Sequence, residues 1–291
     1  RKIVLMYKWD AVTALDIIEK EKITMFNGVP TMTHEILEAS KLHPEKDLSS
    51  LKDLGAGGAA RPPEQLEQHK KEFPDKNALI GYGLTETNAG GTNAGGQFLL
   101  NKPSTAGFPM PLITKIRIVD EENNVLNAEK EGEIEIKTAS NFTCYWKDQE
   151  ATDEVLNQEG WFKSGDIGYL DDEGFLFIKD RKKDIVIRGG ENIACLEVEA
   201  VIHENIYIKE ASVFGVPDDR LGEKLVARVS VEDLSKVNEL DLQTFLQGKI
   251  ASFKIPEIIW LQKDPLPKIA TGKTAKKEMR EEAILKLGLN T

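Results

Sequence analysis

The first part of the chain alternates segments with helical spacing of apolar residues and short apolar runs. After Asp10, which can cap a helix N-terminus, Leu15, Ile18 and Lys22 follow at helical spacing. A short apolar run at residues 23–26 then ends at Asn27-Gly28, and such a run is typical of a buried parallel strand. The pattern predicts a helix followed by a parallel strand.

The same alternation continues to residue 83. A second helix is predicted from Thr31 or Thr33, and a third from the two prolines at 62–63 to the basic pair at 70–71. Residues 78–80 form a further predicted strand that leads into a glycine-rich turn. Helices that alternate with strands indicate an α/β layer architecture.

The pattern changes after Pro103. Residues 115–119 and 133–137 alternate polar and apolar side chains on either side of a turn at 121–124, which predicts antiparallel sheet and a small β-barrel subdomain. Further along, a helix, two strands and two more helices predict a separate α+β domain. The expected fold class is therefore α/β and α+β, multidomain, with parts at residues 1–102, 103–182 and 183–291.

Composition narrows the function classes. The 291 residues carry a net charge of −11, which argues against a general nucleic-acid role because phosphate binding needs clustered basic residues. No run approaches the ~20 apolar residues that span a bilayer. Cys144 and Cys195 form no CxxC pair, which suits a reducing cytoplasm, and the four histidines show no HExxH metal spacing. The chain begins without Met on strand-like residues, so we expect a piece of a longer fold.

The segment with the richest chemistry is residues 81–87 (GYGLTET). Its glycines let the backbone approach a ligand closely. Tyr82 offers a flat face for a purine, Thr85 a hydroxyl for a phosphate, and Glu86 a hard oxygen for Mg²⁺. An ordinary turn with an exposed carboxylate fits the same residues equally well.

Two other segments could contribute to a nucleotide site. Residues 55–60 (GAGGAA) could let an adenine lie against the backbone, although close packing of a strand and a helix explains small residues too. In residues 161–168 (WFKSGDIG), Asp166 on a predicted loop can accept hydrogen bonds from two ribose hydroxyls, or it can stabilise a turn. Neither segment is specific alone.

The last two segments are basic. Residues 180–184 (DRKKD) and 188–192 (RGGEN) read individually as solvated turns. Residues 267–274 (PKIATGKT) contain Gly-Lys-Thr, but a Walker loop needs a glycine where this chain has Pro267, so we reject that interpretation. Lys273 remains as a point charge that can reach an anionic site, although most lysines are simply solvated.

Taken in their order along the chain (55–60, 81–87, 161–168, 180–192 and 267–274), the five segments closely resemble the adenylate-forming enzymes. That superfamily comprises acyl-CoA synthetases, the adenylation domains of peptide synthetases, and beetle luciferases. The resemblance covers essentially all 291 residues, and its specific parts are residues 82–86 (YGLTE) and 180–184 (DRKKD). Within the superfamily the chain looks most like medium- or long-chain fatty acyl-CoA ligases.

The resemblance implies a role for each candidate residue. For the nucleotide it places Gly58 and Ala59 along the adenine, Tyr82 stacked on it beside Gly83, Thr85 at the α-phosphate, Glu86 on Mg²⁺, and Asp166 and Arg181 at the ribose. Lys183 would be the hinge of a small mobile C-terminal domain. Lys273 would enter the site during adenylation, and the Gly189-Gly190 loop would replace it to form the channel for coenzyme A.

The implied reaction uses ATP, Mg²⁺ and coenzyme A to convert a carboxylic acid, expected to be a fatty acid, into its thioester through an acyl adenylate. The family's upstream Ser/Thr/Gly-rich phosphate loop has no counterpart here. Residues 1–102 would then be an incomplete α/β subdomain of the large domain, and we expect this chain alone to be weak or inactive.

Two other interpretations stay open. The acyl group could pass to a carrier-protein thiol in place of coenzyme A, or the chain could be a nucleotide-binding piece without turnover. The glycines at 90–91 and 95–96 could leave room for a long or bulky acyl group, or they could belong to a mobile surface loop.

Overall fold

The computed structural model describes residues 2–59, 61, 63–269 and 272–289. Their contacts divide the chain into two compact units. Unit 1 comprises Arg1–Ile116, Ile136–Phe162 and Leu170–Phe177, and unit 2 comprises Arg117–Glu135, Lys163–Tyr169 and Ile178–Thr291. The predicted three-part division at residues 102 and 182 stays a prediction.

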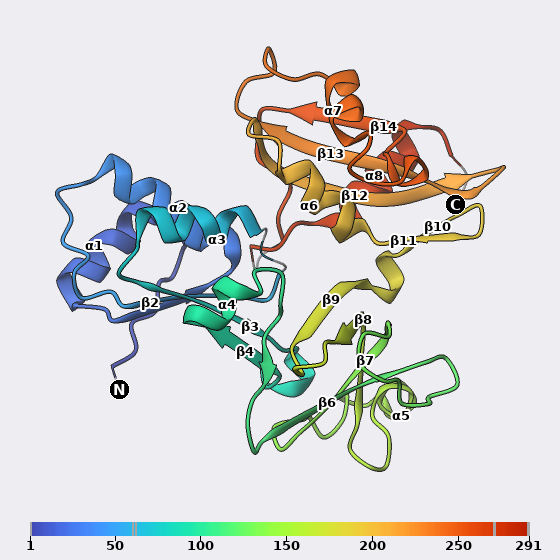
Figure 1. Ribbon diagram of the computed structural model, residues 1–291, viewed down its shortest axis with the longest axis horizontal. Helices are drawn as coiled ribbons and strands as arrows, with labels where there is room; N and C mark the ends of the chain where they lie inside the picture. The colour runs from blue at the N-terminus through green and yellow to red at the C-terminus, as the bar shows by residue number, and fades with distance from the viewer. Residues whose placement is uncertain (1, 60, 62, 270–271, 290–291) are drawn as a thin grey trace. The chain divides into compact units, whose positions relative to one another are not determined.

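Unit 1 contains a five-stranded sheet in the order β1-β2-β3-β4-β5 (Figure 1). Its strands are β1 (Met25–Gly28), β2 (Asp53–Gly57), β3 (Asn77–Tyr82), β4 (Thr92–Gly95) and β5 (Phe108–Pro109). The first three strands pair in parallel and the last two pair antiparallel. The helices around it are α1 (Ala11–Glu21), α2 (Pro30–Leu42), α3 (Pro63–Glu72) and α4 (Gly96–Asn101). The predicted α/β architecture is confirmed.

Local sequence explains where the first helices begin and end. Asp10 caps α1 as predicted, because its carboxylate accepts the backbone N–H of Thr13 at 2.8 Å. The helix ends at Lys22, which adopts a left-handed φ of 51°. The predicted threonine cap of α2 is wrong: the helix begins at Pro30, whose fixed φ suits a first helical position, and Thr33 donates its hydroxyl back to the Pro30 carbonyl at 2.8 Å.

The segments that alternate polar and apolar residues are strands of a second sheet. It has the order β6-β7-β8-β9, with β6 (Thr114–Val119), β7 (Gly132–Thr138), β8 (Phe162–Leu170) and β9 (Leu176–Arg181). The sequence placed Asp166 on a loop, and that is wrong: it lies inside β8. Helix α5 (Gln149–Val155) was not predicted from the sequence. Asp148 caps it, because its carboxylate accepts the N–H of Ala151 at 3.0 Å.

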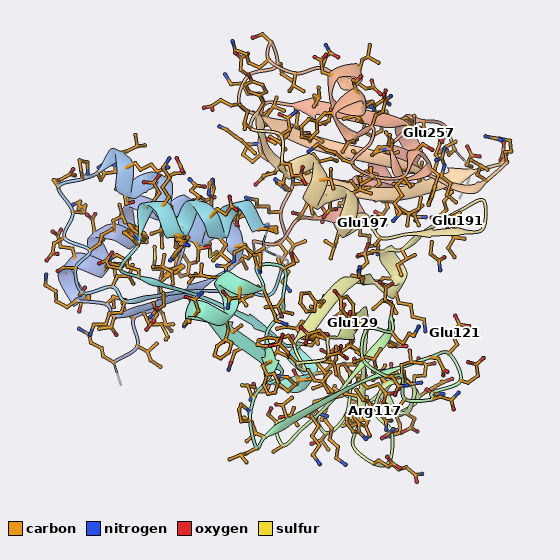
Figure 2. The ribbon with its side chains drawn as sticks, viewed as in Figure 1. Arg117, Glu121, Glu129, Glu191, Glu197 and Glu257 are labelled. Atoms are coloured by element: carbon orange, nitrogen blue, oxygen red, sulfur yellow. The ribbon has the colours of Figure 1, made fainter. Side chains whose placement is uncertain are left out.

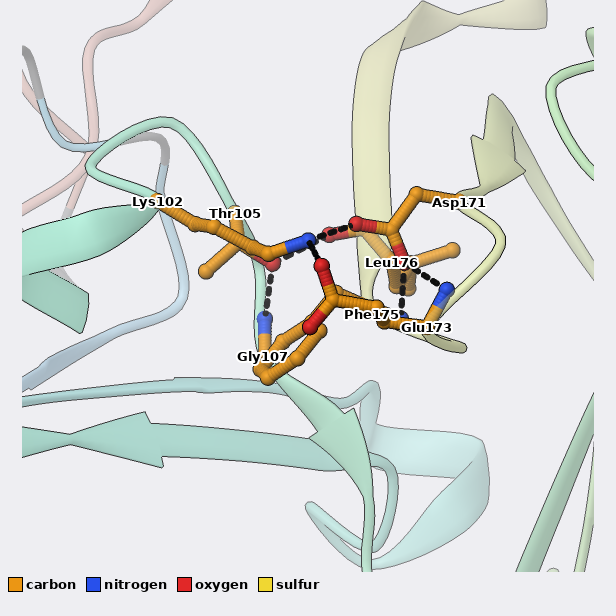
Figure 3. A network of polar contacts seen from close by, with 7 residues as sticks. All are labelled: Lys102, Thr105, Gly107, Asp171, Glu173, Phe175 and Leu176. Atoms are coloured by element: carbon orange, nitrogen blue, oxygen red, sulfur yellow. Dashed lines mark hydrogen bonds and ion pairs between the residues drawn. The ribbon is translucent and has the colours of Figure 1, made fainter. Parts of the chain in front are cut away.

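A polar network closes the turn between β8 and β9 within unit 1 (Figure 3). The ammonium of Lys102 pairs with Asp171 and, at 2.8 Å, with Glu173, and it lies 4.8 Å from the ring centroid of Phe175. Thr105 donates its hydroxyl to the Leu176 carbonyl at 2.8 Å. These bonds connect the segment after α4 to the turn at residues 171–174.

Unit 2 contains a sheet covered on both faces. Its strands run in the order β11-β10-β13-β12, and a fifth strand pairs with β13. They are β10 (Val186–Arg188), β11 (Glu191–Ile193), β12 (Ile208–Asp218), β13 (Gly222–Val231) and β14 (Ile258–Gln262), with helices α6 (Cys195–His203), α7 (Glu239–Leu246) and α8 (Lys276–Lys286). The α+β architecture predicted for this part is confirmed.

Successive residues of β12 face opposite layers of that core. Val213 packs in a buried cluster with Val198 of α6 and Leu242 of α7, whereas Phe214 packs with Met279 of α8. Because side chains alternate across a strand, α6 and α7 lie on one face of the sheet and α8 on the other. Met279, Ala283 and Ile284 hold α8 against this face through the same cluster.

The acidic surplus lies at the surface. Figure 2 shows Glu121 and Glu129 in the connection between β6 and β7, and Glu191, Glu197 and Glu257 in unit 2, and all five are exposed. The labelled Arg117 has a partner, because its Nε lies 2.6 Å from the carboxylate of the buried Glu135. Among the helices of the described residues, none is both long enough and apolar enough to cross a bilayer.

Candidate functional site

The loop between β3 and β4 is closed by direct backbone contact. A Cβ at Gly83 would lie 2.6 Å from the backbone of Ala89, and a Cβ at Gly91 would lie 2.1 Å from the carbonyl oxygen of Tyr82. Only glycine fits at either position. The strand end at Tyr82 and the strand start at Thr92 therefore hold residues 83–91 in a tight loop. Of the glycines at 90–91 and 95–96, Gly91 serves this packing, whereas a Cβ at Gly96 would have no atom within 4 Å. The acyl pocket stays a prediction.

Thr87 fixes the turn at the tip of this loop. Its buried hydroxyl accepts the N–H of Leu84 at 3.0 Å and donates to the Leu84 carbonyl at 3.1 Å. Ser140 donates its hydroxyl to the Thr87 carbonyl at 2.8 Å. The resulting 3₁₀ turn (Thr85–Thr87) leaves Thr85 exposed and Glu86 half-buried.

The carboxylate of Glu86 has a partner that the sequence did not indicate. Tyr145 donates its hydroxyl to Glu86 Oε1 at 2.8 Å. Burial and this hydrogen bond raise the pKa of Tyr145 to about 12, so the phenol stays a donor near neutral pH. The ring of Tyr145 lies 4.8 Å from that of Phe142, whose N–H donates to the Glu86 carbonyl at 2.6 Å. In the sequence, the aromatic residues in 142–146 were the signal that could have indicated this partner of Glu86.

The oxygen donors at Glu86 fit a Mg²⁺ ion that is also bound by the phosphates of a nucleotide. Mg²⁺ in nucleotide sites usually takes one or two carboxylates and completes its shell with substrate phosphates and water. Within the described part of the chain, no group of three or more His, Cys, Asp or Glu side chains forms a closed cage. A single carboxylate held by Tyr145, beside the Thr85 hydroxyl, suits the first arrangement.

The small-residue segment at the end of β2 lies beside Tyr82. Gly57 pairs with Gly81 across parallel strands, and a Cβ at Gly57 would approach the Gly81 carbonyl to 3.0 Å. Gly58 follows with a left-handed φ of 78°, and both it and Ala59 are exposed. Parallel strands end at the same edge, which is where α/β sheets bind ligands. Unit 1 thus brings Gly58, Ala59 and Tyr82 to one sheet edge.

Unit 2 brings Asp166 and Arg181 together. Arg181 Nε lies 3.4 Å from Asp166 Oδ1, although the two residues belong to different strands. Asp166 is only 4% exposed, whereas Arg181 is exposed. The backbone N–H of Asp166 donates to the Ser164 hydroxyl at 3.0 Å, which fixes the strand beneath the carboxylate. A buried carboxylate beside an exposed guanidinium can bind neighbouring hydroxyls.

The remaining predicted residues also lie in unit 2. Lys183 is exposed within the 3₁₀ turn Lys182–Asp184. Gly189 and Gly190 form the turn between β10 and β11 with left-handed φ values of 61° and 90°, and the N–H of Gly189 donates to the Leu221 carbonyl at 2.8 Å. Glycine is the residue that adopts such a turn without strain.

Lys273 lies in a hairpin at residues 267–275, of which residues 270–271 fall outside the described part. The N–H of Ile269 donates to the Lys273 carbonyl at 2.8 Å, and that of Ala275 donates to the Pro267 carbonyl at 2.8 Å. The predicted residues thus form a set in unit 1 and a set in unit 2. The first is Gly58, Ala59, Tyr82, Gly83, Thr85 and Glu86; the second is Asp166, Arg181, Lys183, Gly189, Gly190 and Lys273. Their convergence on one ligand stays a prediction.

Comparison with known proteins matches both parts of the chain. The family model described as AMP-binding enzyme matches residues 1–146, and the one described as AMP-binding enzyme C-terminal domain matches residues 197–273. A long-chain-fatty-acid–CoA ligase of Bacillus subtilis is 39% identical over 285 residues, which are 97% of this chain and 49% of that protein. A 2-succinylbenzoate–CoA ligase of Bacillus pumilus is 34% identical over 284 residues, which are 97% of this chain and 56% of that protein.

Solved structures agree with the fold. The structure of ATP-bound MatB from Rhodopseudomonas palustris matches with a TM-score of 0.85 at 28% identity, over 96% of this chain and 54% of that one. The chain spans about half the length of the curated relatives it matches. The family and the fold class predicted from the sequence are confirmed.

Proposed function

Because the chain belongs to the AMP-binding enzyme family, we propose that it supplies the C-terminal half of an AMP-forming acid–thiol ligase. The enzyme joins a carboxylic acid to coenzyme A at the expense of ATP. The observation that carries the proposal is the turn at Thr85 and Glu86, where a hydroxyl and an oriented carboxylate stand beside the sheet edge of Tyr82, Gly58 and Ala59.

In the first half-reaction, a carboxylate oxygen of the acid attacks the α-phosphorus of ATP. The bond from that phosphorus to the bridging oxygen of pyrophosphate breaks, and the acyl adenylate forms. Tyr82 and the backbone at Gly58 and Ala59 bind the adenine, and Asp166 with Arg181 binds the ribose. Thr85 orients the α-phosphate, and Glu86, held by Tyr145, carries Mg²⁺.

Two anions meet in this step, so positive charge must be concentrated at the transition state. Magnesium, when bound, offsets the charge of the phosphate oxygens. The ammonium of Lys273 supplies the second positive charge at the reacting oxygens. Since the thiol must later occupy the same place, Lys273 has to leave after adenylation.

In the second half-reaction, the thiolate of coenzyme A attacks the acyl carbon, and the bond to the AMP oxygen breaks. We assign Lys183 as the hinge on which the C-terminal part turns between the two steps. The Gly189-Gly190 turn then lines the thiol channel, where the absence of side chains lets the pantetheine pass.

We propose a fatty acid as the acid. Support comes from the 39% identity to a long-chain-fatty-acid–CoA ligase. A relative at 34% identity bears the name of an aromatic acid, so the choice of acid needs a direct test.

The test joins this chain to the upstream half of the Bacillus subtilis ligase and measures pyrophosphate release with a panel of acids. We expect release with long- and medium-chain fatty acids, followed by acyl-CoA on addition of coenzyme A, and little release from the chain alone. The parent ligase is the positive control. Release with 2-succinylbenzoate but not with fatty acids would overturn the substrate, and transfer to a carrier-protein thiol but not to coenzyme A would overturn the acceptor.

A further inference from the structure

A largely buried ion pair lies in unit 2, outside every position assigned to a ligand. Lys276 Nζ lies 2.9 Å from Glu199 Oε1, and the two side chains are 21% and 14% exposed. Glu199 Oε1 also accepts the backbone N–H of Val213 at 2.7 Å. Buried charges persist only when they are paired and hydrogen-bonded, as these are, and apolar residues would stabilise the core at least as well. The pair therefore calls for a role beyond stability.

The lysine of this pair stands at the base of the hairpin that carries Lys273. Only Thr274 and Ala275 separate the two lysines. Ala275 is buried, and its N–H closes the hairpin by donating to the Pro267 carbonyl at 2.8 Å. The anchor at Lys276 therefore fixes the point and the direction in which the hairpin leaves α8.

The glutamate of the pair connects to the strand that carries Arg181. Glu199 lies on α6, and the N-terminus of α6 is held by Asp180, whose carboxylate accepts the N–H groups of Cys195 and, at 3.3 Å, Leu196. Burial raises the pKa of Asp180, and the positive charge of Lys276 opposes that rise. Helix α6 thus links Asp180, the residue before Arg181, to the Glu199–Lys276 pair, whose lysine directly follows the Lys273 hairpin.

We propose that Lys276 is a positioning residue for adenylation: its ion pair with Glu199 holds the hairpin so that Lys273 projects in a single direction. The catalytic part of this inference rests on the proposed function, whereas the anchoring part concerns this chain alone. The thioester-forming step, during which Lys273 is withdrawn, does not need the anchor.

Four variants test the proposal. Lys276→Met breaks the pair and leaves Glu199 buried and unpaired, which itself destabilises the fold. The double variant Glu199→Gln/Lys276→Met removes both charges of the pair and keeps an acceptor for the Val213 N–H. Lys276→Arg keeps the charge, and Lys277→Met, at a neighbouring side chain that is 90% exposed, is the matched control.

Two readouts are needed. Hydrogen exchange at the amides of Ile269 and Gly272, measured on this chain, reports the order of the hairpin. We expect about tenfold faster exchange in the double variant, with α6 and α8 still protected, and no change in Lys277→Met. In the joined enzyme, pyrophosphate release should fall about tenfold in kcat with little change in KM, thioester formation from supplied acyl adenylate should persist, and Lys276→Arg should recover most of the loss.

A folded double variant with wild-type hairpin protection, or with wild-type adenylation, would overturn the proposal. An equal loss of both half-reactions would also overturn it, because that result indicates a merely structural role. If the hairpin loosens as expected while the unsubstituted joined enzyme releases no pyrophosphate, the anchor stands and the proposed function fails.

Discussion

The loop at residues 82–91 and the hairpin at residues 267–275 carry the predicted catalytic residues of the two units, and they are held in different ways. The loop is closed by backbone atoms in contact, with no room for a Cβ at Gly83 or Gly91. The hairpin is anchored by ion pairs on both sides: Lys268 pairs with Glu210 at 2.8 Å, and Lys276 pairs with Glu199 at 2.9 Å.

This difference matches the work proposed for each segment. Steric closure tolerates almost no movement, which suits Glu86, the carboxylate proposed to hold Mg²⁺ throughout adenylation. An anchor of charged side chains fixes the base of the hairpin that carries Lys273, the residue proposed to enter and leave the site. Under the proposed function, Lys273 enters the site and later leaves it, whereas Glu86 stays in place.

The largest expected effect is the loss of adenylation rate when Lys273 in the hairpin is substituted. In the joined enzyme, Lys273→Ala should slow adenylation by about 10²–10³-fold, because a preorganised positive charge at the reacting oxygens is lost. Thioester formation from supplied acyl adenylate should remain within about twofold of the unsubstituted rate, and Lys277→Ala should change neither step. Normal adenylation with a failed thioester step would reverse the roles given to the hairpin.

The loop should respond most strongly in stability. Gly91→Ala places a Cβ against the Tyr82 carbonyl and should lower the free energy of unfolding of unit 1 by about 2–3 kcal/mol, as overpacking does. Gly81→Ala is the matched control, because its Cβ would have no neighbour nearer than 3.5 Å. Urea titrations of the two variants measure the difference. Equal midpoints would show that the loop is not sterically closed.

A substitution of Tyr145 tests whether Glu86 in the loop needs the hydrogen bond that Tyr145 donates to it. Tyr145→Phe should raise the Mg²⁺ concentration needed for half-maximal adenylation about tenfold, since a bond to a charged group is worth about 1.5 kcal/mol. Tyr7→Phe, at an exposed side chain, should have no effect. An unchanged magnesium requirement would mean that Tyr145 does not orient Glu86.

The same variant makes a prediction for pH. The pKa of Tyr145 rises from 10.0 to about 12 on folding, so the folded protein favours the neutral phenol. Its stabilising contribution should be fully present below pH 10 and decline as pH rises from 10 to 12. The difference in unfolding free energy between the unsubstituted chain and Tyr145→Phe should follow that course, and a loss below pH 9 would contradict it.

Salt should give the smallest effect and separate the two segments without any substitution. Raising NaCl from about 0.1 to 1 M screens partly exposed pairs such as Lys268 with Glu210. We expect the Ile269 amide of the hairpin to exchange about two- to threefold faster, while the Ala89 amide of the loop is unchanged. Equal responses would mean that both segments are held in the same way.

The sequence predicted features that depend on local chemistry. The cap at Asp10 and the strand leading into Tyr82 follow from residues next to one another, and both are present. The order of the motif segments identified the family, because each motif needs particular residue types at fixed spacing. Features that follow from periodicity and capping could therefore be predicted from the sequence.

Contacts between distant segments were not predictable in the same way. Tyr145 meets Glu86 across 59 positions, and Lys276 at the start of α8 meets Glu199 of α6 only because both helices pack on the same sheet. Asp166 was expected on a loop between apolar residues, but it lies in a strand that pairs with strands on both sides. Burial of a charged pair in a tertiary core leaves no periodic mark in the chain.

Under the proposed function, one nucleotide binds to residues of both units, and a calorimetric titration of this chain with AMP tests that proposal. We expect one site per chain, about tenfold weaker binding in Tyr82→Ala and in Asp166→Asn alike, and unchanged binding in Asp120→Asn, at an aspartate outside the candidate site. Binding that survives either of the first two substitutions at full strength would contradict it.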